Sequence, residues 1–310
     1  MEDTHMNTLS SNSLIGHLQK YWPLYVMAIP GIVFFIIFKF IPMGGSIIAF
    51  QEYSIFKGIL DSPWVGFKNF NLLFESPDFY RVFTNTLILG LLKITIIFPV
   101  PIALALLINE IRVTLLKKSV QTALYVPHFL SWVIIAGIAF DFLSINGMFN
   151  IVREWFGMES KLIMQEEGYF RWIYVLTGIW RDAGWGTIVY LAAISSIDSQ
   201  VYEAAVIDGA NRIKQMFYIT LPLLLPTIVI LFLMDLGNFM ELGFDHVYNL
   251  LTPMTYSVGD IIDTYVFRTG IQGARYSFAT AVGLFQAVIG FILVIIFNKL
   301  SKKVSGGGLW

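Results

Sequence analysis

The sequence contains no cysteine, few charged residues and only four histidines. The absence of cysteine excludes disulfides, thiolate metal ligands and cysteine nucleophiles. The histidines are scattered without the spacing of a metal site, so we expect no metal in this chain. Charged residues make up 13% of the 310 residues, and the net charge is −1. Because no large cluster of lysine and arginine is present, we expect no nucleic-acid partner.

Nucleotide-binding and catalytic motifs are also missing. The sequence has no GxxxxGK[ST] phosphate loop, which indicates that the chain does not bind ATP in the P-loop manner. No Ser, His and Asp set, metal motif or pair of carboxylates on a suitable scaffold is recognisable. We therefore predict that the chain is not an enzyme and holds no cofactor of its own.

Hydrophobic residues, in contrast, make up 56% of the chain, which is far above the range of soluble domains. A hydrocarbon core of about 30 Å requires roughly 20 apolar residues per helix. The apolar runs are too long and continuous for the strands of a barrel. We predict an all-α integral membrane protein with six transmembrane helices at Leu24–Pro42, Val82–Ile108, Val120–Leu143, Trp172–Ile194, Leu221–Leu242 and Phe278–Phe297. The first run is too long for a signal peptide and is expected to remain in the mature protein.

Basic residues set the predicted orientation. Lysine and arginine cluster at 112–118 and at 299–303. The positive-inside rule places both clusters on the cytoplasmic side. Both termini are then cytoplasmic, and segments 43–81, 144–171 and 243–277 are outside.

The sequence VYEAAVIDGANRIKQMFYITLP, residues 201–222, is a charged segment between two apolar runs. Apolar residues recur from Val206 at spacings of four, three and four, which is typical of an amphipathic helix. Asp198 or Ser199 can cap a first short helix, and Gly209 can let the chain bend into a second one. On this pattern alone, a linker helix on the membrane surface is the simpler interpretation.

The residue types in this segment resemble the EAA loop of permease subunits of ABC importers. The matching residues are Glu203, Ala204, Ala205, Gly209, Ile219, Leu221 and Pro222. In that family the loop is a coupling helix seated in a cleft of a separate ATPase subunit. The resemblance implies a coupling loop at 198–222, with ATPase contacts from Glu203, Ala204, Ala205, Asp208, Gly209 and Ala210.

The resemblance extends to both ends of the chain. The stretches PGIVFFIIFKFIPMGGSIIAFQEYSIFKGI, SPWVGFKNF and DIIDTYVFRTGIQGARYSFATAVGLFQAVIGFILVIIFNKLSKKVSGGGLW are similar to LplB-type polysaccharide permeases, a branch of the carbohydrate-uptake group. This implies a type I importer permease fold in a bacterial plasma membrane. The implied parts are a cytoplasmic segment 1–23, a first helix and extracellular loop 24–81, a permease core 82–300 with five membrane helices, and a cytoplasmic tail 301–310.

The resemblance also implies partners. A second permease subunit would complete a heterodimeric pathway for an oligosaccharide, and two ATPase subunits would use ATP and Mg. An extracellular solute-binding protein would deliver the sugar. ATP binding would draw the coupling helices together and rock the two permease halves from inward- to outward-facing.

Polar and aromatic residues at membrane depth are candidates for the substrate pathway, because a charged group in hydrocarbon normally faces a cavity or a partner. The candidates are Trp132, Arg181, Asp182, Trp185, Phe232, Asp235, Asn238, Phe239, Glu241 and Gln286. Packing between helices is the alternative for each. Gly178, Gly184 and Gly186 allow either close helix packing or a kink, and Pro99, Pro101, Pro127 and Pro226 are expected to bend or interrupt helices.

The predicted outer segments are long for plain connections. The stretch FNIVREWFGM is amphipathic enough for a short helix on the outer surface. Asp260, Asp263, Tyr265 and Arg268 are candidates for docking of the binding protein, since charged rims can steer a partner. Solvated loops without a partner are the alternative.

Two other functions fit the composition. An ABC importer permease can carry a solute other than a sugar. An ion-coupled secondary transporter would bury carboxylates at membrane depth and often show two related halves. No internal repeat is recognisable, which disfavours the secondary transporter.

Overall fold

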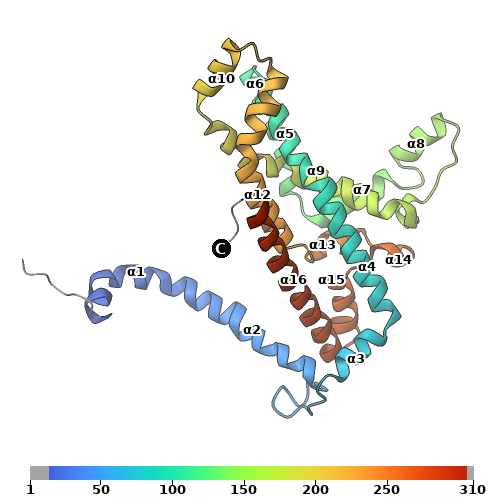
Figure 1. The fold of residues 1–310 in the computed structure, drawn as a ribbon. Coiled ribbons are helices and arrows are strands. Elements are labelled where there is room, and N and C mark those ends of the chain that lie inside the picture. The colour runs from blue at the N-terminus through green and yellow to red at the C-terminus, as the bar shows by residue number, and fades with distance from the viewer. Residues whose placement is uncertain (1–13, 306–310) are drawn as a thin grey trace, which may run out of the picture.

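The computed structural model describes residues 14–305, which form a helical bundle with one long arm (Figure 1). The described residues contain no strand, so the all-α prediction is confirmed. In the first half the elements, with η for 3₁₀ or π segments, are α1 (Leu14–Phe35), η1 (Ile36–Phe40), α2 (Ile41–Gly44), η2 (Gly45–Phe50), α3 (Lys68–Glu75), α4 (Pro77–Leu92), η3 (Lys93–Ile97), α5 (Pro99–Asn109), α6 (Thr114–Tyr125), η4 (Val126–Phe129) and α7 (Trp132–Phe142). In the second half they are α8 (Met148–Trp155), η5 (Ile163–Gln165), α9 (Glu167–Ser195), α10 (Ser199–Ile207), α11 (Arg212–Gln215), η6 (Met216–Thr220), α12 (Leu221–Gly237), α13 (Phe244–Leu250), η7 (Pro253–Thr255), α14 (Tyr256–Gly259), α15 (Ile262–Val266), η8 (Phe267–Gln272) and α16 (Tyr276–Ser305). The predicted terminal segments extend into 1–13 and 306–310, which lie outside the described residues.

Four helical stretches of the described chain are long and apolar enough to cross a membrane. They are Tyr21–Phe50, Pro77–Asn109, Arg212–Gly237 and Tyr276–Lys299. They coincide with the first, second, fifth and sixth predicted spans. The fifth ends earlier than predicted, because the helical geometry stops at Asn238 and not at Leu242. The chain is therefore a multi-pass membrane protein.

The third predicted span is not a single straight helix. Its two halves, Thr114–Phe129 and Trp132–Phe142, meet at an angle of 102°, and they add a fifth span only if the bent pair counts as one. Pro127 lies in the 3₁₀ turn η4, and Leu130 after it is extended. The span predicted at Val120–Leu143 is therefore present only as this bent pair, and the expected interruption at Pro127 is confirmed.

The fourth predicted span lies entirely within α9, which has 29 residues. Arg171, Arg181 and Asp182 distinguish α9 from the four apolar helices. α9 packs against α5, α6, α7, α12 and α13 and therefore occupies the middle of the bundle. Its buried Tyr174 joins Leu89 and Val247 in one apolar core cluster.

The other core clusters join the remaining helices. Phe79, Ile262 and Val282 connect α4, α15 and α16. Ala105 and Leu224 connect α5 to α12. The buried apolar residues thus form separate clusters along the bundle, and polar groups lie between these clusters.

The first membrane helix leaves the bundle as an arm, which Figure 1 shows in blue. It stays attached at one end, where η2 packs on α16. The Tyr53 amide donates to Ser277 Oγ at 2.9 Å. The Asn69 side-chain amide donates to the carbonyl oxygens of Ala49 and Gln51, which fixes the connection to α3.

Two glycines of α9 are sites of close helix contact. A Cβ added to Gly184 would overlap the backbone carbonyl of Leu124 in α6, and one on Gly186 would lie 2.9 Å from Pro101 in α5. Of the two roles left open by the sequence, close packing is therefore the one that Gly184 and Gly186 have.

We expect Gly184→Ala to lower the stability of the chain by about 1–3 kcal/mol, because the clashing atoms are backbone atoms that cannot rotate away. Thermal unfolding of the purified chain in detergent measures this. Gly168→Ala in the first turn of the same helix is the matched control, since nothing lies within 4 Å of its added Cβ. The higher helix propensity of alanine should leave its stability unchanged or raise it by up to about 1 kcal/mol. Equal effects of the two substitutions would contradict the contact.

Candidate transport cavity and coupling loop

A cavity of about 360 Å³ opens between η3, α7, α9, α13 and the segment 238–243 that follows α12. Its polar and aromatic lining residues are Lys93, Trp132, Tyr174, Asp182, Asn238, Glu241 and His246. The Nζ atom of Lys93 lies 3.9 Å from Asp235 Oδ1 and 3.4 Å from the carbonyl oxygen of Glu241. Lys93, in the second span, thus contacts polar groups at and just after the C-terminal end of α12.

A second cavity of about 590 Å³ lies between α12, α15 and α16 and shares Glu241 and Gly243 with the first. In its wall, Gln286 Nε2 donates to Asp263 Oδ1 and to the Met240 carbonyl oxygen, each at 3.0 Å. The two cavities therefore meet at Glu241 and form one polar region with carboxylate, amide and ammonium groups.

Aromatic rings stack beside the first cavity. The rings of Trp132 and His246 are 3.6 Å apart at 11°, and Tyr174 stacks on His246 at 4.4 Å. The Arg181 guanidinium lies 4.5 Å from the centre of the Trp132 ring. His246 also contacts Thr177 Oγ1 through Nε2 at 2.9 Å. These contacts hold Trp132 in place at the start of α7.

The charges of α9 are paired at the break before α7. Arg181 donates to Asp182 Oδ1 at 2.8 Å and to the Leu130 carbonyl oxygen at 3.1 Å. His128 Nδ1 lies 2.9 Å from the same Asp182 oxygen, and its ring stacks on Trp185 at 4.5 Å. The local pairing of Arg181 with Asp182 places both side chains next to the cavity.

Most of the predicted pathway residues lie in or beside this region. Those that line a cavity are Trp132, Asp182, Asn238, Glu241 and Gln286, while Arg181, Trp185 and Asp235 contact lining or neighbouring groups. Phe239 is 7% exposed in the core and lies against Gly90, so it presents no face to a sugar. Phe232 packs on Phe98 at 5.3 Å and lines neither cavity.

Sequence reasoning missed Lys93, His128, Tyr174 and His246. Lys93 is the only charged residue within the predicted span Val82–Ile108, and this isolated charge was sufficient to identify it from the sequence. The histidines act through stacking with residues distant in sequence, which spacing does not reveal.

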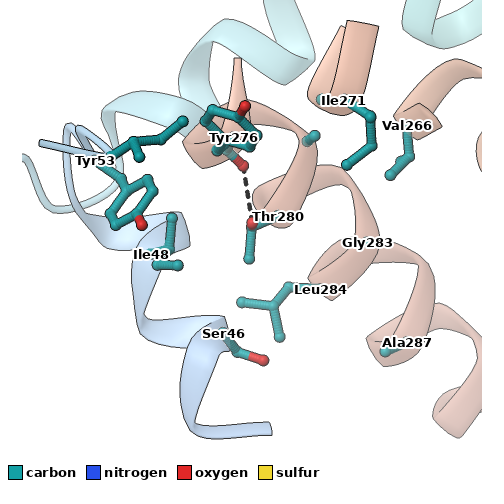
Figure 2. Close-up of a pocket in the computed structure, with 13 residues that line it drawn as sticks. Ser46, Ile48, Tyr53, Val266, Ile271, Tyr276, Thr280, Gly283, Leu284 and Ala287 are labelled. Atoms are coloured by element: carbon teal, nitrogen blue, oxygen red, sulfur yellow. Dashed lines mark hydrogen bonds between the residues drawn. The ribbon is translucent and has the colours of Figure 1, made fainter. Parts of the chain in front are cut away.

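A third cavity, of about 620 Å³, lies between η2 and α16 (Figure 2). Ile48 and Tyr53 line one side, and Tyr276, Thr280 and Leu284 the other. The Thr280 hydroxyl donates to the Tyr276 carbonyl oxygen of its own helix at 2.8 Å. Unlike the other two cavities, this one has no charged side chain in its lining.

The segment 198–222 forms the short helix α10 and the start of the continuous helical stretch Arg212–Gly237, at the end of the bundle opposite α3 (Figure 1). Asp198 caps α10 by accepting from the Gln200 amide at 2.9 Å, which confirms one of the two predicted caps. Gly209 has a φ of +75°, a value that favours glycine, and ends α10 as expected. Asn211 then caps α11.

Two contacts hold this segment on the bundle. Arg212 pairs with Glu110 after α5 at 3.1 Å, and the Tyr202 hydroxyl lies 2.9 Å from Thr220 Oγ1. On the free side, Val206 is 62% and Ile207 86% exposed. The segment 198–222, held in place by these contacts, thus presents an apolar surface beside Glu203, which is also exposed.

The predicted docking residues of the outer segment are partly inaccessible. Asp260 is fully buried and accepts from Arg268 Nη1 at 3.0 Å and from Thr264 Oγ1 at 2.8 Å. These hydrogen bonds with Asp260 raise the pKa of Arg268 above its usual value. Tyr265 is 5% exposed, and Asp263 faces the second cavity. The prediction that Asp260 and Tyr265 contact the binding protein directly is therefore corrected. Both side chains have an internal, structural role.

Residues 97–306 match the family described as binding-protein-dependent transport system inner membrane component. This match covers more than half of the chain. The chain belongs to this family. The family region begins at the end of η3 and contains the segment 198–222 and α5 to α16, whereas α1 to α4 precede it.

Relatives in this permease family match nearly the full length. The polygalacturonan/rhamnogalacturonan transport system permease protein YteP of Bacillus subtilis (strain 168) is 48% identical over 293 residues, which are 94% of this chain and 91% of that protein. Protein LplB of the same organism is 43% identical over 288 residues, covering 93% and 91%. The resemblance to LplB-type permeases is confirmed.

A solved structure shares the fold. A chain of the bacterial alginate ABC transporter in complex with an alginate pentasaccharide-bound periplasmic protein has a TM-score of 0.88 and 41% identity, covering 96% of this chain and 99% of that one. The type I importer permease fold predicted from the resemblance agrees with this likeness.

We expect Asp260→Ala to destabilise the chain by about 3 kcal/mol, because it leaves the Arg268 guanidinium without its buried partner. Thermal unfolding and limited proteolysis of segment 243–277 measure the loss. The exposed Asp245 of the same segment serves as control, and Asp245→Ala should change stability by no more than about 0.5 kcal/mol. Similar unfolding of the two variants would refute the structural role of Asp260.

Proposed function

We propose that this chain is one permease subunit of an ABC importer that carries oligosaccharides released from polysaccharides. The observation that carries the sugar assignment is the polar region joined at Glu241, where hydrogen-bonding groups lie beside the Trp132 ring. Carbohydrates require this combination of polar groups and apolar ring faces. The polysaccharides named for YteP and for the alginate transporter support the same class of substrate.

In the proposed topology six spans cross the membrane, with the bent pair α6–α7 and helix α9 as the third and fourth. α9 is long enough for this, and its charged residues Arg181 and Asp182 are paired with each other. The basic residues near 112–118 and 299–303 favour a cytoplasmic location for both termini and for α10.

Coupling to ATP hydrolysis would pass through α10. The exposed Glu203, Val206 and Ile207 form a surface that can enter a cleft of an ATPase subunit, and Ala204 permits close approach. Because Arg212 is paired with Glu110, a movement of the segment 198–222 would also move the end of α5. ATP and Mg are used by two such ATPase subunits in this proposal.

The remaining partners complete the cycle. An extracellular binding protein would deliver the sugar, and a second permease subunit would supply the other wall of the pathway. Asn238 and Glu241 line the cavities and are exposed, which is consistent with a missing wall.

The function is tested by the ATPase activity and uptake of the assembled transporter in proteoliposomes with its binding protein. Oligogalacturonides or alginate oligosaccharides should stimulate both. Uptake should persist with proton and sodium ionophores while ATP is maintained, and its collapse would instead support an ion-coupled transporter.

We expect Asn238→Leu to lower oligosaccharide uptake about tenfold, the equivalent of one lost hydrogen bond to the sugar. The variant should still assemble. Met234→Leu is the control, because Met234 lies one turn earlier on α12, is exposed and lines neither cavity. Equal uptake by the two variants would remove Asn238 from the pathway.

We expect Glu203→Lys to uncouple ATP hydrolysis from uptake, since it reverses the charge beside the apolar surface of α10. ATPase activity and uptake are measured on the same proteoliposomes. Lys214→Glu in α11 reverses a charge outside the matched EAA positions and should leave the ratio of the two activities close to that of the unmodified protein. An assembled Glu203→Lys transporter with normal uptake would refute the coupling role.

A further inference from the structure

α8, between α7 and α9, has an apolar face that the bundle leaves uncovered. Met148, Ile151, Val152 and Trp155 recur at the spacing of one helix face and are 57%, 40%, 37% and 78% exposed. Phe156, directly after the helix, is 75% exposed. A stripe of this spacing is typical of a helix that lies on an apolar surface.

Hydrogen bonds on the polar side of α8 join the helix to its own flanking loops. Asn150 is fully buried and donates to the carbonyl oxygens of Ser144 and Lys161, each at 2.8 Å. It also accepts from the Lys161 amide at 3.1 Å. Arg153 donates to the Glu159 carbonyl oxygen at 3.0 Å. All of these partners lie within 144–161, so the bonds join α8 to its own flanking loops, and the apolar stripe lies on another side of the helix.

The place of α8 in the fold indicates what covers this stripe. The helix begins at Met148, shortly after α7 ends at Phe142, so it lies where the chain leaves a membrane helix. Figure 1 shows α8 to the side of the bundle, away from α12 and α16, which line the second polar cavity. The first polar cavity is lined in part by α7 and α9. A bilayer surrounds a membrane protein from its sides, whereas a binding protein that delivers a solute must sit over the pathway.

An apolar cavity of about 560 Å³ lies between α7, α8 and α9. Phe142, Phe149, Trp172 and Leu176 are among its lining residues. Its lining includes the hydroxyl-bearing side chains of Tyr169 and Thr177, and the Thr177 hydroxyl is already bonded within α9 and to His246. With no charge in this lining, the wall suits a hydrocarbon ligand, and the volume is that of a small-ligand site.

We propose that α8 and this cavity form a lipid site in the outer leaflet. The stripe of α8 lies at the boundary of headgroups and acyl chains, and one acyl chain enters the cavity between α7 and α9. Trp155 and Phe156 have the side chains preferred at that depth, while Arg153 and Glu154 remain among polar groups. The leaflet follows from the proposed topology, whereas the lipid contact itself is independent of the transported solute.

The cysteine-free sequence permits a direct test by single labelled positions. Val152→Cys on the stripe and Glu154→Cys on the same helix are each labelled with bimane. The full chain is then reconstituted in phosphatidylcholine vesicles that contain spin-labelled phosphatidylcholine. We expect severalfold stronger quenching at position 152 than at 154 by a spin label near the headgroup end of the acyl chain. Aqueous iodide should quench in the opposite order.

Leu176→Cys tests the cavity in the same vesicles. Its label should be quenched more by a spin label near the methyl end of the acyl chain than by one near the headgroup. Both α8 variants must elute as the unmodified chain does in size-exclusion chromatography. Equal lipid quenching at 152 and 154, or iodide quenching at 152 or 176, would overturn the proposal. Protection of position 152 from iodide by added binding protein would show that the stripe is a docking surface for that protein instead.

Discussion

The charges of α9 must be satisfied inside an apolar bundle, and this requirement fixes the arrangement around the candidate pathway. Asp182 accepts from Arg181 and contacts His128, while Arg181 also binds the Leu130 carbonyl oxygen. An unpaired charge at membrane depth costs several kcal/mol. The break between α6 and α7 exposes the Leu130 carbonyl that Arg181 uses, so the bend and the charges of α9 stabilise each other.

The same break positions the aromatic side of the cavity. Because α7 starts at Trp132, its ring lies between the charges of α9 and helix α13, where it stacks on His246. At its other end, α9 stops at Ser195, immediately before α10. One helix of 29 residues thus connects the polar cavity to the proposed coupling surface, and a rigid movement of α9 would alter both ends together.

The sequence alone predicted the features that depend on long apolar runs or on local backbone chemistry. The four apolar helices, the cap at Asp198 and the turn at Gly209 are of this kind. It failed where distant segments decide the role of a side chain. Asp260 was predicted to be a solvent-facing docking residue because it lies in a polar segment, but Arg268 and Thr264 enclose it.

The residues predicted for the cavity show the same difference between features that the sequence predicts and features that it does not. Asn238 and Glu241 were predicted because polar residues at one end of an apolar helix are unusual, and they line the cavity. Phe239 between them was predicted as an aromatic face for a sugar and is buried, since the helix ends at Gly237 and the following turn directs it toward Gly90. Whether a side chain near the end of the helix faces the cavity or the core depends on the residue at which the helix stops, and the sequence alone does not give that residue.

The membrane helices bury little of their surface within this chain, and this bears on how the pathway is completed. The most apolar window of the first span is 0% buried, and those of the other three apolar helices are 11% to 17% buried. Lipid can cover the apolar part of this surface, but it cannot pair with exposed polar groups such as Asn238 and Glu241. We infer that another polar or water-filled surface must face these residues. A second permease subunit meets that requirement, because it would enclose the polar region while leaving the apolar faces to the bilayer.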